Sequence, residues 1–491
     1  MTPDSQETIL LALLVPLVGA CGMALAWKRA NLRETVTLFT SGLLLLLVWS
    51  LVPGVLAGDR PELRLIEMLP GLAISFKVEP LGMLFACVAS LLWPINSIYS
   101  IGYMRGNRES RQTLFYICFA IALSAAIGVA FAGNLLTLFV FYEVLTLSTY
   151  PLVTHKGNDS ARQGGRVYLG ILISTSILLL LPAIVWTLVA AGTLDFTPGG
   201  VLRGHLEGPL LGLLLFLFMF GIGKAALMPV HRWLPAAMVA PTPVSALLHA
   251  VAVVKAGVFS IVKVIVYIFG IDLLQEVSSG DWLLYVAGFT IIVASVIALR
   301  QDNLKRRLAY STVSQLSYVI LGAAILAPIS VLGAAIHIAA HAFGKITLFF
   351  AAGAIYTAAH KTEISQLRGI GRRMPWTMLA FSIGALSMIG VPPAAGFISK
   401  WYILSGALQT EQLLAVLVII ASTLLNAAYF VPIIYSAFFL REDVGLTGDG
   451  HGEAPLPIVI ALTMTAGLTI LMFFMPELPL ALAQQLILTA K

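Results

Sequence analysis

The sequence predicts an all-α polytopic membrane protein, and three observations carry this prediction. Of the 491 residues, 59% are hydrophobic and 11% are charged, and the mean hydropathy is +0.96. Soluble globular proteins carry about 25% charged residues, so the composition excludes a soluble enzyme, a disordered chain and a nucleic-acid-binding protein. Apolar stretches long enough to cross a bilayer recur along the whole chain, and most charges lie between them.

Fourteen candidate spans follow when the chain is divided by the length of a membrane helix, which is about 20 apolar residues. They are 8–27, 36–57, 80–104, 113–131, 135–154, 167–192, 209–230, 239–270, 282–299, 308–326, 330–357, 375–406, 413–440 and 455–476. The first span follows Asp4 and Glu7 rather than a basic segment, so we expect no cleaved signal peptide.

The charges between the spans predict the orientation of the chain. Loops after odd-numbered spans sum to +10, whereas loops after even-numbered spans sum to −6. By the positive-inside rule, the odd-numbered loops face the cytoplasm and both termini lie outside it. The loop 441–454 sums to −3 on the predicted cytoplasmic side. We expect it to be a solvated loop; a docking surface for a basic partner is the alternative.

Cysteine usage and nucleotide motifs give no sign of a cofactor. Cys21, Cys87 and Cys118 lie in apolar stretches without a CxxC pattern, so we expect no iron–sulfur cluster or structural zinc. No GxGxxG or Walker motif follows a predicted strand, so we expect no bound nucleotide. The chain is therefore expected to hold no cofactor and to be driven by an ion gradient or a partner subunit.

Six ionisable charges remain inside the spans: Glu143, Lys224, Lys255, Lys263, Lys345 and Lys400. Each costs at least about 2.5–3.5 kcal/mol at the centre of a membrane helix, so such residues face a wet cavity or a partner and commonly mark an ion path. Histidines, which titrate near neutral pH, join them at three positions: His249, His337 and His341. Lys263 lies nearer the outside, and we expect its side chain to snorkel.

Glu143 and Lys224 are predicted to form a pair between spans 5 and 7. The functional interpretation is that the carboxylate controls when the lysine is protonated. The structural interpretation is a charge neutralised only for packing. Span 7 reaches Pro229 five residues after Lys224, and proline breaks or kinks a helix. Inside a membrane, broken backbone is tolerated where it lines a cavity.

Span 12 repeats this arrangement, because Pro392 and Pro393 precede Lys400. Two interrupted spans with a midspan lysine are typical of corresponding positions in a duplicated transporter. The predicted organisation is 1–112 for helices 1–3, 113–270 for a first five-helix repeat, 282–440 for a second and 455–491 for helix 14. Five is odd, so the second repeat is inverted relative to the first.

Span 11 places His337, His341 and Lys345 at i, i+4 and i+8, which is one helical face. A zinc-protease HExxH motif would need glutamate where Ile338 stands, so we expect a proton relay rather than a metal site. In span 8, His249 and Lys255 are six residues apart, and an unbroken helix would not put them on one face.

Four stretches together resemble a known family: HRWLPAAMVAPTPVSALLHA at 231–250, LAYSTVSQLSYVILG at 308–322, HIAAHAFGK at 337–345 and GFISK at 396–400. They are similar to the antiporter-like subunits shared by respiratory complex I, membrane-bound hydrogenases and Mrp-type multisubunit cation/proton antiporters. The resemblance runs from about residue 80 to 440. It implies fourteen helices with inverted five-helix repeats and interrupted helices 7 and 12.

The resemblance also implies roles for individual residues. The family's helix-5 glutamate matches Glu143, its helix-7 lysine Lys224, its central helix-8 lysine Lys255 and its helix-12 exit residue Lys400. Its polar positions in helices 8 and 11 match His249, His337, His341 and Lys345. One complex I subunit type has glutamate in helix 12, and the largest complex I member has a long lateral helix after span 14. This chain has neither, which favours the D-type member of an Mrp antiporter, although hydrogenase-associated relatives share both features.

The expected function is that of a proton-translocating subunit in a multisubunit Na⁺/H⁺ antiporter of the inner (cytoplasmic) membrane. The expected partners are other membrane subunits, protons, Na⁺ (which can cross in a partner instead) and lipid, and no nucleic acid. Three alternatives stay open: a proton-pumping subunit of a redox-driven complex, an energy-coupling subunit for inorganic-carbon uptake, and a structural scaffold.

Overall fold

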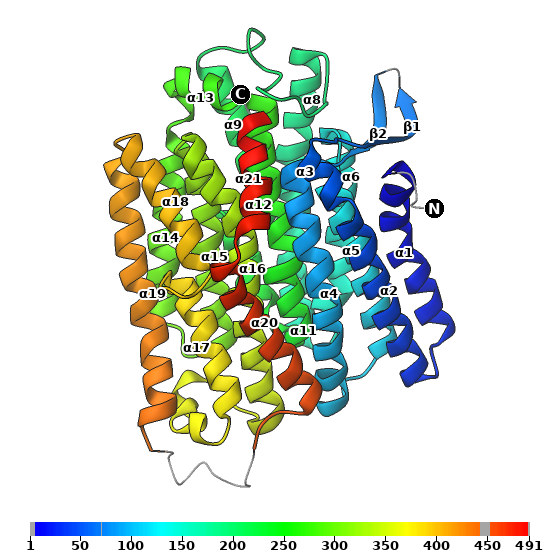
Figure 1. Cartoon of the computed structure of the whole chain (residues 1–491), viewed down its shortest axis with the longest axis vertical. Helices are drawn as coiled ribbons and strands as arrows, with labels where there is room; N and C mark the ends of the chain where they lie inside the picture. Colours follow the sequence, from blue (N-terminus) through cyan, green and yellow to red (C-terminus); the bar gives the residue numbers. More distant parts are fainter. Residues whose placement is uncertain (1–4, 70, 442–451, 490–491) are drawn as a thin grey trace.

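The computed structural model describes residues 5–69, 71–441 and 452–489, excluding the side chains of 69, 248, 249 and 489. Its helices run mostly along one long axis and pack side by side into an elongated bundle (Figure 1). The acidic loop 442–451 lies outside the described residues.

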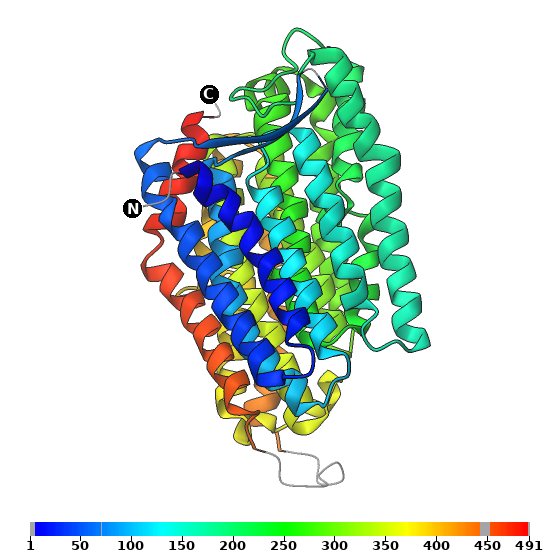
Figure 2. The same ribbon diagram turned by 90° about the vertical axis from the view of Figure 1, so that its right-hand side faces the viewer.

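The N-terminal part contains four helices and a β-hairpin. Its elements are α1 (Ser5–Leu25), α2 (Ala30–Ser50), α3 (Val52–Ala57), β1 (Glu62–Leu69), β2 (Leu72–Lys77) and α4 (Pro80–Gly106). The hairpin is antiparallel, with Glu62 opposite Lys77, and it lies across one end of the bundle (Figures 1 and 2). The segment between spans 2 and 3 is therefore not an irregular loop, because the start of β1 alternates charged and apolar residues as a strand with one covered face does.

The next part carries the first interruption of the helical pattern. Its longer helices are α5 (Gln112–Ala130), α6 (Leu135–Val153), α7 (Asp159–Thr175), α8 (Leu181–Ala191), α9 (Pro209–Gly221) and α12 (Val253–Val264). Short α-helices are α10 (Trp233–Ala236), α11 (Thr242–Ala246) and α13 (Ile271–Glu276). Single turns of 3₁₀ helix occur at Gly223–Ala225, Val230–Arg232, Ala237–Val239 and Ser278–Gly280, and π-helical turns at Ser176–Leu180, Leu247–Val251 and Ile265–Phe269.

The last part carries the second interruption. Its elements are α14 (Trp282–Leu299), α15 (Leu304–Ala324), α16 (Pro328–Ala359), α17 (Pro375–Ile389), α18 (Gly396–Gln409), α19 (Leu413–Phe439), α20 (Leu456–Phe474) and α21 (Glu477–Thr489). Two 3₁₀ turns, Ile364–Leu367 and Ile370–Arg372, precede α17. The sequence pattern does not separate the last helix from the predicted helix 14. This last helix ends near the end of the bundle at which α1 begins (Figures 1 and 2).

Asparagine side chains fix where several helices begin. Asn134, Asn158 and Asn303 each stand at the N-cap of α6, α7 and α15 and accept a hydrogen bond from a backbone amide three residues later. Such caps satisfy amides that the first helical turn leaves without a partner.

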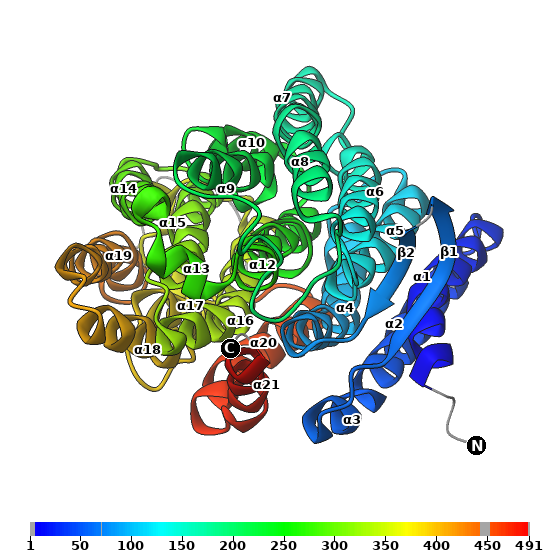
Figure 3. The ribbon, with the colours of Figure 1, turned by 90° about the horizontal axis from the view of Figure 1, so that it is seen from above.

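Burial divides the helices into an inner and an outer set. In the described part of the chain, ten helical stretches are long and apolar enough to cross a membrane, and α9, α17 and α21 are shorter apolar helices. The apolar window of α16 is fully buried, whereas about a third to a half of it is buried in α1, α2, α19 and α20. Seen from above, α16 lies among the other helices (Figure 3). The face that α16 turns toward α12 and α18 is thus shielded from lipid.

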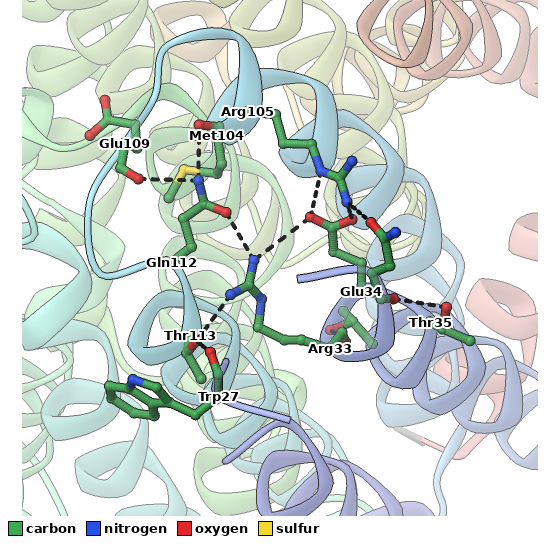
Figure 4. A network of polar contacts seen from close by, with 11 residues as sticks. Trp27, Arg33, Glu34, Thr35, Met104, Arg105, Glu109, Gln112 and Thr113 are labelled. Carbon is green, nitrogen blue, oxygen red and sulfur yellow. Dashed lines mark hydrogen bonds and ion pairs between the residues drawn. The ribbon is translucent and has the colours of Figure 1, made fainter. Parts of the chain in front are cut away.

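A network of charged and polar side chains joins α2, α4 and α5 at the end opposite the hairpin (Figure 4). Arg33 donates to Thr113 at 3.0 Å and to Gln112 at 2.9 Å, and Arg105 pairs with Glu34. Glu34 and Arg33 are both 5% exposed. The network lies at an end of the bundle, away from the midspan charges.

Interruptions occur in three of the predicted spans. Helix α9 ends at Gly221 and Lys224 lies in the following 3₁₀ turn, so the interruption begins before the predicted break at Pro229. Pro392 and Pro393 lie in the connection between α17 and α18. Span 239–270, which is predicted as one stretch, is divided by a kink at Ala252. A Cβ on Gly257 would clash with the backbone of Lys224 and Ala225, so α12 packs directly on the interrupted segment.

Candidate functional site

Lys224 lies in the first interruption and is completely buried. Its Nζ donates to the backbone oxygen of Tyr142 at 2.8 Å and to Thr146 Oγ1 at 2.5 Å. The same ammonium lies 3.1 Å from the centre of the Tyr142 ring, a cation–π contact that is strongest when water is excluded. Its backbone amide donates to the Tyr142 hydroxyl at 3.0 Å. The α6 helix therefore holds this lysine through neutral groups.

Glu143 is next to these partners in the sequence but does not contact the lysine in this structure. Its two carboxylate oxygens are buried, and they accept no hydrogen bond from the described residues. Tyr142 and Thr146 share one face of α6 because they are four residues apart, whereas Glu143 is rotated from Tyr142 by about 100°. The direct Glu143–Lys224 pair predicted from the sequence is thus not formed in this structure. Lys224 binds Tyr142 and Thr146 instead.

Lys255 and His341 form the central contact of the site. Lys255 lies in the first turn of α12, just after the kink at Ala252, and its Nζ is 2.7 Å from His341 Nδ1 on α16. Both side chains are fully buried. An ammonium donates in this contact to a neutral imidazole, and a neutral amine accepts from the other tautomer. The contact can therefore exist in two protonation arrangements.

His337 continues the row one turn along α16. Its ring centre lies 6.0 Å from that of His341, and its Nδ1 is 2.8 Å from Ser399 Oγ on α18. Ser399 immediately precedes Lys400. The side chains of α12, α16 and α18 thereby meet inside the bundle: Lys255 contacts His341 and His337 contacts Ser399, with 6.0 Å between the two imidazole ring centres.

Lys400 lies beside the second interruption and binds the C-terminal end of α17, the helix before the break. Its Nζ donates to the backbone oxygens of Met388 at 2.6 Å and Ile389 at 3.1 Å, which are the last two residues of α17. The final carbonyls of a helix lack partners within it and carry a partial negative charge. Gln315 also donates to the Met388 oxygen, at 3.3 Å. A buried cation is thus held by a helix terminus, and its ammonium lies 4.6 Å from the Tyr318 ring.

Lys345 lies one turn beyond His341 on α16. Its Nζ donates to Ser311 Oγ on α15 at 2.9 Å, and the Tyr429 hydroxyl donates to the same oxygen at 3.0 Å. Ser311 of the predicted span 10 therefore provides a neutral partner for Lys345.

Two residues that the sequence predicts as polar positions inside the membrane, His249 and Lys263, are not part of the contacts described above. Only the backbone of His249 is described, in the π-helical turn Leu247–Val251, and its side chain lies outside the described residues. Lys263 does not snorkel to solvent: its side chain is fully buried and pairs with Glu79. The described residues contain no group of three metal-ligating side chains.

Several contacting residues were not identified from the sequence. Tyr142, Thr146, Ser399 and Tyr318 carry no charge, and buried hydroxyl groups are common in membrane helices. A usable signal existed for Tyr142 and Thr146, whose spacing places two oxygen-bearing side chains on one face of the glutamate-containing helix.

Comparison with known proteins places this geometry in a family. Residues 132–426 match the family described as "NADH:quinone oxidoreductase/Mrp antiporter, TM". The match covers more than half of the 491 residues and includes every predicted path residue from Glu143 to Lys400. The chain belongs to this family.

Members of this NADH:quinone oxidoreductase/Mrp antiporter family include proteins with different names. The N subunit of the NADH-quinone oxidoreductase of Desulforudis audaxviator is 33% identical over 393 residues, covering 79% of this chain and 77% of that protein. The D subunit of the Na(+)/H(+) antiporter of Alkalihalophilus pseudofirmus is 26% identical over 469 residues, covering 94% of both.

The fold is also that of a solved structure. A chain of the Mrp complex from Dietzia sp. DQ12-45-1b superimposes with a TM-score of 0.88 and 23% identity, covering 99% of this chain and 97% of that one. The helical membrane fold and the family predicted from the sequence are confirmed. The count of fourteen spans, the inverted repeats and the roles of single residues stay predictions.

Proposed function

We propose that this chain is the proton-translocating subunit of a multisubunit Na⁺/H⁺ antiporter. The observation that carries the proposal is the 2.7 Å contact between two fully buried bases, Lys255 and His341. A purely structural contact would not need two titratable groups in a medium where each charge is costly. The same row reaches Lys400 through His337 and Ser399, which gives protons a lateral route at mid-membrane.

The interrupted helices supply the two ends of this route. Lys224 and Lys400 each lie beside a break, and each is held by oxygen atoms that it can exchange for other partners. When Lys224 moves from Thr146 to Glu143, the carboxylate stabilises its proton; when it returns, the proton is released toward Lys255. We place the breaks in corresponding helices of two inverted repeats, 113–270 and 282–440. We also propose an inner-membrane location with both termini outside the cytoplasm.

Substitution of the first pair tests the proposal. Glu143→Ala and Lys224→Ala should lower Na⁺-driven proton exchange by about 100-fold, the scale of a lost acid–base group. The assay uses membrane vesicles from a strain that lacks its other antiporters, together with growth in high salt. Arg203→Ala is the control, because Arg203 is an exposed residue whose pair with Glu276 lies at the bundle's end. Undiminished exchange in both variants at normal expression would refute the roles of Glu143 and Lys224.

A second function is favoured by one specific observation, the 33% identity to the N subunit of an NADH-quinone oxidoreductase. In a redox-driven complex, the same residues would carry protons while partners supply the electron transfer. The proteins that purify with this chain distinguish the two functions. Small membrane subunits support the antiporter, and subunits that bind iron–sulfur clusters support the redox pump.

A further inference from the structure

A second buried acid–lysine pair lies outside the predicted path. Lys263 on α12 is 0% exposed and Glu79, just before α4, is 3% exposed. The lysine Nζ lies 3.1 Å from Glu79 Oε2. In the sequence, Glu79 stands in a loop and Lys263 is expected to reach solvent alone, so neither residue predicts the other as its partner.

The pair is connected to solvent on one side. Lys77 Nζ, at the end of β2, lies 3.7 Å from the other oxygen of Glu79, and the Lys77 side chain is 28% exposed, against 4% for Glu79 and 0% for Lys263. Three titratable groups therefore lead from partly exposed to fully buried. Lys77 is the last residue of β2 and Glu79 directly precedes α4, and the hairpin crosses the end of the bundle (Figure 2).

Two apolar rings and one backbone oxygen also contact the Lys263 ammonium. Lys263 Nζ lies 4.3 Å from the centre of the Phe196 ring and 5.5 Å from that of Phe259. It also donates to the backbone oxygen of Ala132 at 2.7 Å. Among the described residues, Glu79 is thus the anionic partner of this ammonium.

The position of the pair connects it to the mid-membrane row. Lys263 is eight residues from Lys255 on the same stretch of helix, a rise of about 12 Å. Between them, Gly257 packs against the backbone of Lys224. Ala132, the carbonyl partner of Lys263, precedes the α6 helix that carries Glu143. Lys263 thus lies about two helical turns from Lys255 and beside the segment that leads into α6.

A purely structural purpose is a weak explanation for a pair buried this deeply. Taking both ions out of water costs several kcal/mol each, and apolar residues of similar volume often stabilise such a site as well or better. The three-step gradient of exposure is, in contrast, what a route between solvent and a buried base requires.

We propose that Glu79 and Lys263 form a second proton-exchanging pair, which passes protons between the mid-membrane row and the membrane face that carries the hairpin. This inference rests on the proposed function. In one transfer, the Lys263 ammonium gives its proton to the Glu79 carboxylate, leaving an amine and a carboxylic acid. Glu79 then releases that proton to water at the hairpin surface, and the amine takes a proton from the row. The pair returns to its ionic form and one proton has crossed; the reverse order carries protons inward.

Two variants of the intact complex separate this role from a structural one. Lys263→Arg keeps the positive charge and an ion pair, but arginine does not deprotonate in proteins. Glu79→Gln combined with Lys263→Met removes both charges while keeping similar volumes. We expect both variants to assemble into the complex at normal amounts and to lose about tenfold or more of the exchange rate in vesicles, as a lost proton-transfer group would. The control is Arg203→Gln with Glu276→Gln, an exposed pair near the same end of the bundle.

Each possible outcome of these measurements either supports or overturns the proposed role of Glu79 and Lys263. Normal exchange in either assembled variant would overturn the proposal. If neither variant assembles, the pair is needed for assembly of the complex, and the proposal is likewise overturned. Lys224→Ala, measured alongside, tests the underlying function: if it also retains exchange, the proposed function fails, whereas loss there with normal exchange in Lys263→Arg refutes this inference alone.

Discussion

Thr146→Val tests whether the neutral partners of Lys224 are part of the transport cycle. Valine has almost the shape of threonine, so the change removes the oxygen that lies 2.5 Å from Lys224 Nζ and leaves the packing of α6 intact. The lysine keeps the Tyr142 carbonyl at 2.8 Å and the Tyr142 ring. It therefore loses one of its two hydrogen-bond acceptors at this position, while Glu143 is unchanged.

The size of the effect follows from the charge on the donor. A hydrogen bond to a charged group contributes about 1.5–3 kcal/mol. Since about 1.4 kcal/mol corresponds to a factor of ten, the population of Lys224 beside Thr146 should fall about 10- to 140-fold relative to its position beside Glu143. If the lysine must return to Thr146 to release its proton, the exchange rate falls by up to the same factor.

The assay is the initial rate of Na⁺-driven proton movement in inside-out vesicles, measured with a pH-sensitive dye. Thr149→Val is the matched control: Thr149 is equally buried on the same helix, but its hydroxyl lies 2.6 Å from the Tyr168 hydroxyl. We expect a large loss for Thr146→Val and a near-normal rate for Thr149→Val at equal expression. Equal rates for the two variants would refute the two-position account of Lys224.

Two further predictions concern other parts of the chain. Ser399→Ala removes the 2.8 Å partner of His337 and should slow exchange several-fold. Ser330→Ala, which changes a buried serine on α16 itself, should not, and equal rates would exclude Ser399 from the path. His155 lies in the loop after α6, where burial and the nearby Arg111 lower its pKa from 6.5 to about 4. The unfolded chain binds a proton there that the folded chain does not, so stability should fall as pH drops from about 6.5 to 4. His155→Asn should weaken this dependence in thermal unfolding of the purified protein, and an unchanged pH profile would contradict it.

The positions of the spans and of the second interruption could be predicted because they depend on local composition. A run of about 20 apolar residues can satisfy its backbone in a membrane only as a helix, and adjacent prolines at 392 and 393 interrupt one. The kink at Ala252 could not be predicted, because it lies in a stretch of alanine, valine and leucine with no local signal. It lies five residues before Gly257, where α12 packs on the interrupted segment.

The members of the site could be predicted, but their partners could not. A lysine in an apolar span is visible in the sequence, whereas its contacts depend on how each helix is rotated about its axis. Thus Lys224 meets Thr146 rather than Glu143. Lys305, counted as a loop charge, donates to the backbone of Ala240 at 2.6 Å and so ties α15 to the first interruption. Glu79 lies between the second and third predicted spans, and its position in the chain does not reveal that folding buries it.

The way Lys400 is bound determines which substitutions can probe its role. Its acceptors are the main-chain oxygens of Met388 and Ile389, which remain whatever side chain stands there. A systematic alanine scan would therefore identify Lys400 but not the groups that bind it, because alanine keeps the main-chain oxygen. Unlike a carboxylate, a helix end also cannot be neutralised by acid, so it provides the same field at every pH. The first interruption differs, because its lysine meets a side-chain oxygen, Thr146 Oγ1, which a single substitution removes.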